Sequence, residues 1–233
     1  LSLLVAIRTS SLEYMCMFVQ SIFIFGGNVM QKFFTILVLV AIAISLITIT
    51  VYVLIFKNEV NIYSECRGGQ VAGNIGGSFS LINQDGLVVT DIDVIKEPSL
   101  LYFGYTFCPD ICPLDTYRNV EAVRILDKKG FSVTPIFVTF DPQRDTIEVL
   151  KEFSDFMHPK MIALTGSVEQ IKKITKKYRV YYKKQNNDDQ QNYLIDHTAF
   201  TYLVLPEIGF VDFFRRELTA EQLADKVACF MRK

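Results

Sequence analysis

Two cysteines separated by three residues, placed directly after a long apolar run, constrain this chain more than any other feature. Residues 99–107 (SLLYFGYTF) are uncharged, and residues 108–113 (CPDICP) follow them. A run of this kind is typical of a strand that is covered on both faces of a sheet. Proline after each cysteine disfavours regular helix geometry at Cys108 and Cys112, so we expect a shaped turn that opens a helix. The sequence therefore predicts a buried strand that delivers two close thiols into a turn.

This thiol pair indicates either redox or metal chemistry. Free N–H groups at a helix N-terminus lower the pKa of a thiol and favour the thiolate, the form that attacks disulfides or binds metals. Three residues separate Cys108 from Cys112, one more than in a thioredoxin dithiol. A soft metal site and a redox pair therefore both stay open. The less favoured alternative is a pair of buried or bridged cysteines without chemistry.

A second apolar segment predicts a membrane anchor. Residues 33–56 (FFTILVLVAIAISLITITVYVLIF) contain no charged residue. At 1.5 Å per residue they form a helix of roughly 36 Å, enough to cross a bilayer core of about 30 Å. A cleaved signal peptide would have a shorter apolar region ending in small residues, whereas residues 57–61 are KNEVN. We therefore expect an uncleaved N-terminal transmembrane helix.

Residues 1–29 precede this helix and are harder to interpret. Their apolar stretch, residues 15–25, is interrupted by polar residues and is too short to span comfortably. Because Met30 lies almost directly before the anchor, we interpret residues 1–29 as an over-extended reading of the gene. A second amphipathic or membrane segment is the alternative.

Charges around the anchor give a weak indication of orientation. Lys32 precedes it, whereas Lys57 is followed by Glu59 and Glu65. The positive-inside rule then places the N-terminus inside and the rest of the chain in the periplasm or an equivalent oxidising space. The formal net charge of −1 gives no electrostatic reason to expect nucleic acid as a partner.

The residues after the anchor predict a short linker, 57–73, and one α/β domain, 74–233. About 175 residues suit a single domain with its own core. Strands are expected at 99–105, 133–140, 178–183, 199–205 and 210–214, with a hairpin at 75–89 that turns at Asp85-Gly86; helices are expected at 114–128, 146–156, 168–178 and 219–231. This order is that of a thioredoxin-like fold with a central mixed sheet. Residues 99–105 and 133–140 should be adjacent central strands, with Cys108 at the C-terminal end of the first.

A histidine adds a third soft ligand candidate. His197 follows the polar loop 185–192 and precedes the strand at 199–205, in the hairpin that this topology places beside the cysteine turn. Two thiolates and one imidazole suit Cu(I), or Cu(II) with a weak extra ligand, whereas zinc would want a fourth strong ligand. Asp196 is a candidate to orient the imidazole, with a solvated carboxylate as the alternative. The other histidine, His158, is expected to be an ordinary packed or surface residue.

Two carboxylates and three further cysteines complete the set of candidates. Asp141 ends a strand at the same edge as Cys108, so it is a candidate to face the site, and Asp145 is expected to cap the helix at 146–156. The remaining cysteines are interpreted without chemistry: Cys229 as a small core residue, Cys66 as an exposed residue in a Gly-rich segment, and Cys16 as part of the doubtful leader.

Four motifs in order carry a resemblance to a known family. Residues 102–113 (YFGYTFCPDICP), 137–146 (FVTFDPQRDT), 164–167 (LTGS) and 196–198 (DHT) match it, and the resemblance extends from about residue 33 to the C-terminal helix. The chain resembles the Sco/SenC family of membrane-anchored, thioredoxin-like copper proteins that serve cytochrome c oxidase assembly. The resemblance implies copper bound by Cys108, Cys112 and His197. It also implies delivery of copper to, or thiol reduction at, the dinuclear copper site of oxidase subunit II.

Two functions follow from different classes of protein. The first is a copper chaperone without turnover. We expect it in the inner membrane with its globular domain in the periplasm; the alternative is the mitochondrial inner membrane, with the domain facing the intermembrane space. The alternative function is a thiol–disulfide oxidoreductase that reduces the copper-binding cysteines of its partner through Cys108 and Cys112; a peroxidase is a weaker third. His197 separates the first two, because metal delivery needs it and dithiol exchange does not.

Overall fold

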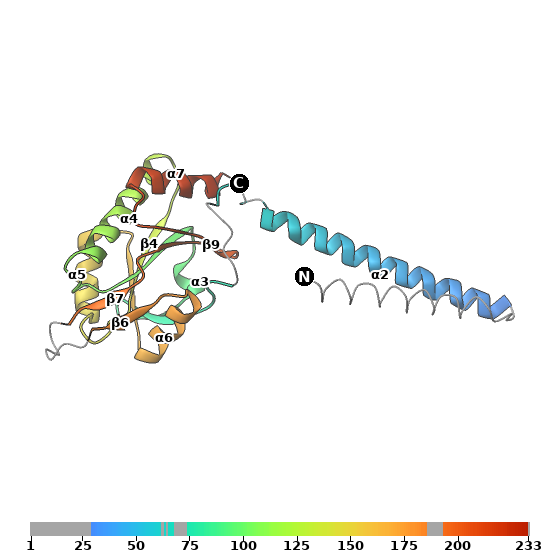
Figure 1. Ribbon diagram of the computed structural model, residues 1–233, viewed down its shortest axis with the longest axis horizontal. Coiled ribbons are helices and arrows are strands. Elements are labelled where there is room, and N and C mark those ends of the chain that lie inside the picture. Colours follow the sequence, from blue (N-terminus) through green and yellow to red (C-terminus); the bar gives the residue numbers. More distant parts are fainter. Residues whose placement is uncertain (1–28, 62, 64, 68–73, 186–192, 233) are drawn as a thin grey trace. The chain divides into compact units, whose positions relative to one another are not determined.

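A computed structural model of the protein describes residues 29–61, 63, 65–67, 74–185 and 193–232 (Figure 1). The expectations for residues 1–28, including Cys16, and for most of the polar loop 185–192 lie outside these residues. The chain divides into two compact units, Leu1–Ile62 and Tyr63–Lys233.

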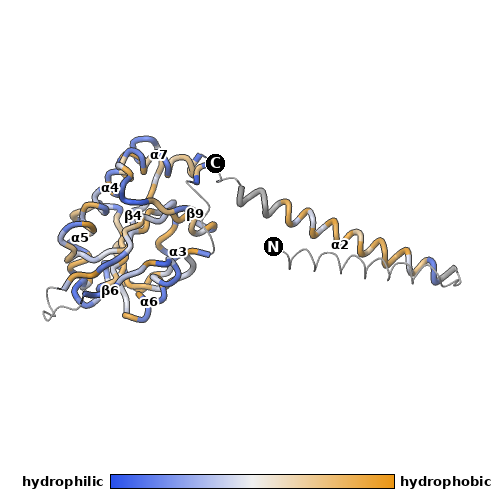
Figure 2. The backbone as a smooth tube through the Cα atoms, viewed as in Figure 1, coloured by the Kyte–Doolittle hydropathy of each residue, from blue (hydrophilic) through white to orange (hydrophobic). Residues whose placement is uncertain are grey.

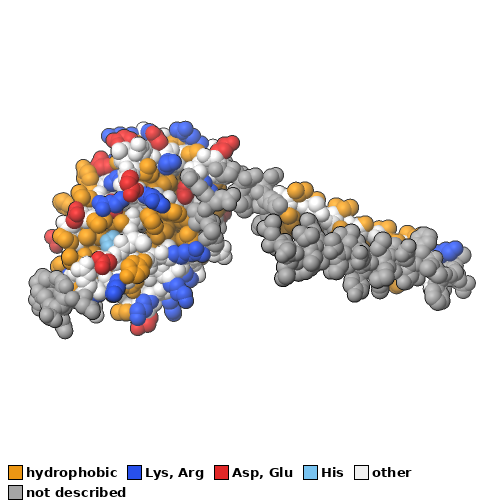
Figure 3. Space-filling model, viewed as in Figure 1, with side chains coloured by type: hydrophobic (Ala, Val, Ile, Leu, Met, Phe, Trp, Pro, Cys, Tyr) orange, Lys and Arg blue, Asp and Glu red, His pale blue; other side chains and the backbone are white. Residues whose placement is uncertain are grey.

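The described part of the first unit is one long helix, α2 (Val29–Asn61). Its segment Gln31–Leu54 is long and apolar enough to cross a membrane, and none of it is buried in the protein. Apolar residues run along this segment (orange in Figures 2 and 3). The hydroxyls of Thr48 and Thr50 donate to helix carbonyls at 2.8 and 2.7 Å, so they need no water. The predicted apolar helix is thus present and has the properties of a membrane anchor.

The second unit is built on a mixed sheet. Among the described residues, seven strands lie in the order β2-β1-β5-β4-β3-β8-β9, and a separate hairpin joins β6 to β7. The strands are β1 (Ser80–Asn83), β2 (Val88–Thr90), β3 (Ser99–Gly104), β4 (Thr134–Thr139), β5 (Ile162–Thr165), β6 (Tyr182–Lys184), β7 (Ile195–His197), β8 (Thr201–Leu205) and β9 (Gly209–Phe214). Central strands β3 and β4 are parallel, with Ser99 opposite Thr134, and β8 is antiparallel to β3. The predicted mixed sheet, with β3 and β4 as adjacent central strands, is confirmed.

Helices cover both faces of this sheet (Figure 1). They are α3 (Asp91–Val94), α4 (Ile111–Lys128), α5 (Ile147–Met157), α6 (Val168–Lys177) and α7 (Ala220–Met231). One core joins α4 and α7 to Leu100 and Leu203 of the sheet. The other contains Leu101 and the α6 residues Ile171 and Ile174. Successive strand residues point to opposite faces, so the fully buried run of β3 supplies both cores.

Three details of the predicted elements need correction. Helix α4 begins at Ile111, three residues before the predicted start, because Pro113 lies in the first turn, where its missing N–H costs nothing. The predicted strand 178–183 is wrong at its start: Arg179 has a φ of 54°, which ends α6, and the strand begins only at Tyr182. The short strands β5 and β7 were not predicted, since runs of four and three residues give too little pattern.

Asp145 has a different role from the one expected. The N-cap of α5 is Thr146, whose hydroxyl accepts a hydrogen bond from the backbone N–H of Val149. The Asp145 carboxylate is fully buried and accepts hydrogen bonds from Thr106 and Thr139. It therefore joins the ends of β3 and β4, the edge of the sheet at which the cysteines lie. Helix α7 begins with a capping box formed by Thr219 and Gln222.

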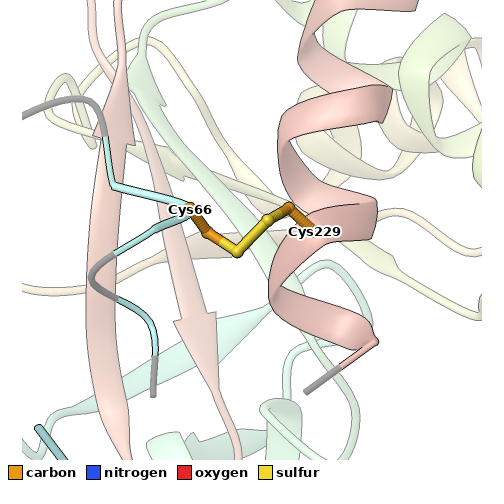
Figure 4. The surroundings of a disulfide bond; sticks show 2 residues. All are labelled: Cys66 and Cys229. Carbon is orange, nitrogen blue, oxygen red and sulfur yellow. A yellow bond between two sulfur atoms is a disulfide. The ribbon is translucent and has the colours of Figure 1, made fainter. Parts of the chain in front are cut away.

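Cys66 and Cys229 form a disulfide, which corrects their interpretation as unrelated residues (Figure 4). Their Cα atoms are 5.6 Å apart across 163 residues of sequence, and Cys66 is buried rather than exposed. Beside the bond, Tyr63 stacks on Phe230, and the Arg67 side chain donates to the carbonyl of Val211 at 3.1 Å. The segment around Cys66, which we expected in the linker, therefore packs on the globular unit.

We expect replacement of Cys66 by Ser to lower the free energy of unfolding by about 2–5 kcal/mol, since the disulfide closes a very long loop. Cys229→Ser and the double replacement should have the same effect as Cys66→Ser, because each removes the same bond. Urea unfolding of the full chain in detergent, followed by tyrosine fluorescence, measures the change. An unfolding free energy equal to that of the wild type in all three variants would show that the bond does not stabilise the fold.

Candidate metal centre

The structure brings Cys108, Cys112 and His197 together. One ligand atom from each residue lies within 4.8 Å of the others. The Sγ atom of Cys112 is 3.2 Å from Nε2 of His197, and the Cys112 backbone N–H donates to Sγ of Cys108 at 3.5 Å. Among the described cysteines, Cys108 and Cys112 are the two with free thiols. Two sulfurs and one imidazole nitrogen thus converge at the end of β3.

Local structure explains where the two thiols lie. Strand β3 ends at Gly104, Cys108 lies in the turn that follows, and Cys112 is the second residue of α4. A Cβ atom on Gly104 would lie 3.2 Å from Sγ of Cys112 and 2.9 Å from the Phe137 ring. Glycine is therefore required for the Cys112 sulfur to approach the strand end so closely. Cys112 is 1 % exposed, whereas Cys108 is partly open to solvent.

The two thiols differ in their tendency to ionise. A hydrogen bond with the Cys112 side chain lowers the pKa of Cys108, and contacts with His197 and the Cys112 N–H act in the same direction, against the effect of burial. The same contact between the sulfurs raises the pKa of Cys112, and burial raises it further. These shifts favour Cys108 as the thiolate of the pair and Cys112 as the thiol. Because metal ligands must be deprotonated, binding of a metal by both sulfurs would release the proton of Cys112.

His197 is oriented by the backbone. Its Nδ1 atom is 3.0 Å from the carbonyl of Thr198, which places the proton on Nδ1 and leaves the Nε2 lone pair directed at the cysteines. The ring packs against Phe140, with centroids 4.9 Å apart. The neighbouring Asp196 instead accepts a hydrogen bond from the Gln185 side chain at 2.7 Å. The imidazole thus presents its Nε2 atom to the cysteine sulfurs.

Asp141 contacts the residues that surround the site. Its carboxylate pairs with Arg144 Nε at 2.6 Å and accepts a hydrogen bond from the Tyr193 hydroxyl at 2.6 Å. We did not select Arg144 or Tyr193 from the sequence. Two signals could have identified them: Arg144 belongs to the matched motif 137–146, and Tyr193 lies four residues before His197.

A buried polar pair that we did not predict, Tyr102 and Asp115, lies beside Cys112. The Tyr102 hydroxyl donates to Oδ2 of Asp115 at 3.1 Å, and both side chains are buried. Burial raises the pKa of both groups. Arg216 approaches the same carboxylate at 3.7 Å. These contacts fix the first turns of α4 under the cysteines.

Comparison with known proteins identifies the family of this chain. The SCO1/SenC family model matches residues 67–232. The chain belongs to the SCO1/SenC family. Protein SenC of Rhodobacter capsulatus is 48% identical over 181 residues, which cover 77% of this chain and 81% of that protein. The mitochondrial SCO1 homolog 1 of Arabidopsis thaliana is 40% identical over 180 residues, 77% of this chain and 53% of that protein.

Solved structures of Sco proteins share the fold. Arabidopsis thaliana ScoI with copper bound is 40% identical, with a TM-score of 0.64, and the match covers 68% of this chain and 99% of that one. Yeast Sco1 with copper bound is 36% identical, with a TM-score of 0.62 over 69% of this chain and 90% of that one. BsSco, described as a member of the Sco family of cytochrome c oxidase assembly proteins, is 25% identical with a TM-score of 0.56, over 70% of this chain and 96% of that one. The predicted family and its thioredoxin-like fold are confirmed.

Relatives of this SCO1/SenC protein thus bind copper, and its own Cys-Cys-His group could hold a metal. The donor set fits that metal by its chemistry, since thiolate sulfur and imidazole nitrogen are ligands that copper prefers.

The unequal pKa values predict unequal alkylation of the two cysteines. In the reduced, metal-free chain, iodoacetamide should modify Cys108 on the order of tenfold faster than Cys112, because the thiolate is the nucleophile. The lowered pKa of Cys108 keeps it reactive as the pH falls, and the raised pKa of Cys112 keeps it unreactive as the pH rises toward 8. Mass spectrometry of the separate peptides measures both rates. Equal rates at neutral pH would contradict this assignment.

Proposed function

We propose that this protein is a membrane-anchored copper chaperone in which Cys108, Cys112 and His197 hold the copper. The observation that supports this most is the position of His197, whose Nε2 lies 3.2 Å from Sγ of Cys112. A dithiol reductase has no need of an imidazole at this place. The copper-bound Sco structures support the choice of metal.

The geometry suits a cargo that must be bound and then released. Three ligands complete the preferred coordination of Cu(I), and Cu(II) would take a weak extra ligand. Cys108 is partly exposed and Cys112 is buried, so an incoming thiolate of a partner would meet the Cys108 side of the copper first. Exchange of one ligand at a time then moves the metal without its release into water. Oxidation of the two thiols to a disulfide would remove both sulfur ligands, so redox state controls retention.

We further propose cytochrome c oxidase subunit II, or another copper-accepting protein, as the recipient. The family supports this assignment, since BsSco is described as belonging to the cytochrome c oxidase assembly proteins. A dinuclear copper site on the recipient would need two copper ions, and therefore two deliveries from a chaperone with a single three-ligand site.

Thiol–disulfide exchange with the same recipient is the second candidate, and a specific observation favours it. The pair combines an ionised, partly exposed Cys108 with a protonated, buried Cys112. This is the arrangement of an attacking and a resolving thiol. In that reaction Cys108 attacks a disulfide of the partner to form a mixed disulfide. Cys112 then displaces the partner, which leaves with two thiols as Cys108–Cys112 is oxidised.

We place the globular unit in an oxidising compartment, the periplasm or the mitochondrial intermembrane space, with α2 as a single membrane anchor. The Cys66–Cys229 disulfide supports this location, because such bonds persist outside the reducing cytosol. The charges of Lys32 before the apolar span and Glu59 and Glu65 after it support the orientation.

Replacing His197 by Asn should lower copper affinity by on the order of 100-fold or more, at least as much as the loss of an outer-shell residue costs. The dithiol should still form a disulfide. Cys108→Ser and Cys112→Ser should each abolish both properties. His158→Asn is the matched control, because Asn can replace the contact that Nδ1 of His158 makes with the backbone N–H of Lys160.

Copper retention by the full chain, and oxidase assembly in cells that express each variant, separate the two functions. If the protein is a copper chaperone, His197→Asn should lose both copper and oxidase assembly, while His158→Asn should keep both. If oxidase assembly persists in His197→Asn although copper is lost, thiol reduction rather than copper delivery would be the favoured function. Full copper affinity and full assembly in that variant would overturn the chaperone with these ligands.

A further inference from the structure

Arg144 lies between the segment that carries Cys108 and the segment that carries His197. It belongs to the turn between β4 and α5, and its Nε donates to Oδ2 of Asp141 at 2.6 Å. The side chains of Arg144 and Asp141 are only 12% and 5% exposed. An ion pair this far from water is held in one geometry, unlike the surface pairs of this domain.

The guanidinium also contacts aromatic rings from both sides of this junction. Its central carbon is 3.6 Å from the ring centroid of Tyr193, 5.4 Å from that of Tyr105 and 5.1 Å from that of Phe107. A planar guanidinium can lie flat on a ring while its edge pairs with a carboxylate, whereas an ammonium group is a point charge without a flat face.

Those rings belong to the two halves of the metal site. Phe107 directly precedes Cys108, whereas Tyr193 lies two residues before β7, the strand that ends at His197. The Tyr193 hydroxyl donates to Oδ1 of Asp141, so the ring is held at its edge as well as its face. A further bond crosses the same junction, because the backbone N–H of Ile195 donates to the Tyr105 hydroxyl at 3.2 Å.

We propose that Arg144 is a positioning residue that sets the distance between His197 and the two cysteines. It does so by joining Phe107 and Tyr105 on the cysteine side to Tyr193 on the histidine side, with Asp141 fixing its own orientation. Such an anchor is useful here, since a two-stranded hairpin alone holds β7 only weakly. The inference deepens the proposed function and rests on it, because the site being positioned is the copper site.

The test compares Arg144→Gln with Arg124→Gln in the full chain. Arg124 pairs with Glu121 on the exposed side of α4, so the control makes the same chemical change away from the junction. In the metal-free, reduced chain, amide hydrogen exchange across residues 193–198 should become faster in Arg144→Gln and stay unchanged in Arg124→Gln. This readout does not depend on copper.

Copper binding supplies the second readout. Arg144→Gln should weaken copper affinity about tenfold, the lower end of what outer-shell residues contribute, and should change the thiolate-to-Cu(II) absorption band. The midpoint potential of the Cys108–Cys112 dithiol should change much less than the copper affinity does, because Asp145 also holds the cysteine turn through Thr106. Arg144→Lys, which keeps the charge but not the planar group, should recover part of the affinity.

Three outcomes would overturn the role of Arg144: exchange and affinity equal to those of Arg124→Gln, a lysine variant no better than the glutamine variant, or a dithiol potential that changes as much as the affinity. Should Arg144→Gln fail to fold, Tyr193→Leu, which removes the stacked ring, takes its place with the same expected results. Failure of the wild type to bind copper at all would instead overturn the proposed function, and the exchange measurement would still judge Arg144.

Discussion

The contact between Sγ of Cys112 and Nε2 of His197 joins residues 85 positions apart, and the site depends on it. Strand order makes the contact possible. Strand β8 pairs with β3, so the chain just before β8 runs beside the end of β3, where the cysteine turn begins. Gly104 then lets the Cys112 sulfur lie against the strand end. The pairing of β3 with β8 thus brings the two segments together, and the absence of a side chain at Gly104 leaves room for the Cys112 sulfur.

Buried polar groups give this edge of the sheet its precision. Asp145 joins the ends of β3 and β4 through Thr106 and Thr139, and Asp141 joins Arg144 to Tyr193. Such groups cost free energy to bury, and the two carboxylates are satisfied by hydrogen bonds in return. Their number around one short turn is what a site needs when its ligands must keep a fixed geometry before the metal arrives.

Much of this could be predicted from the sequence, because the signals are local. The apolar run of β3, the cysteine spacing and the matched motifs were enough for the fold, the family and the three residues that converge. Contacts between distant segments were not visible. The Cys66–Cys229 bond depends on where the two ends of the globular unit meet. We predicted Asp145 as the helix cap because the actual N-cap, Thr146, is the next residue. Arg144 likewise showed its role only once Tyr193 and Phe107 lay beside it.

X-ray absorption at the copper edge tests the central claim most directly, because it reports the atoms bound to copper. The full chain loaded with Cu(I) should show two sulfur ligands and one nitrogen ligand with the multiple-scattering signature of imidazole. The same measurement on His197→Asn should lose the imidazole signature and keep the sulfurs. A wild-type spectrum with sulfur ligands alone, or an imidazole signature that survives in His197→Asn, would contradict the three-ligand site.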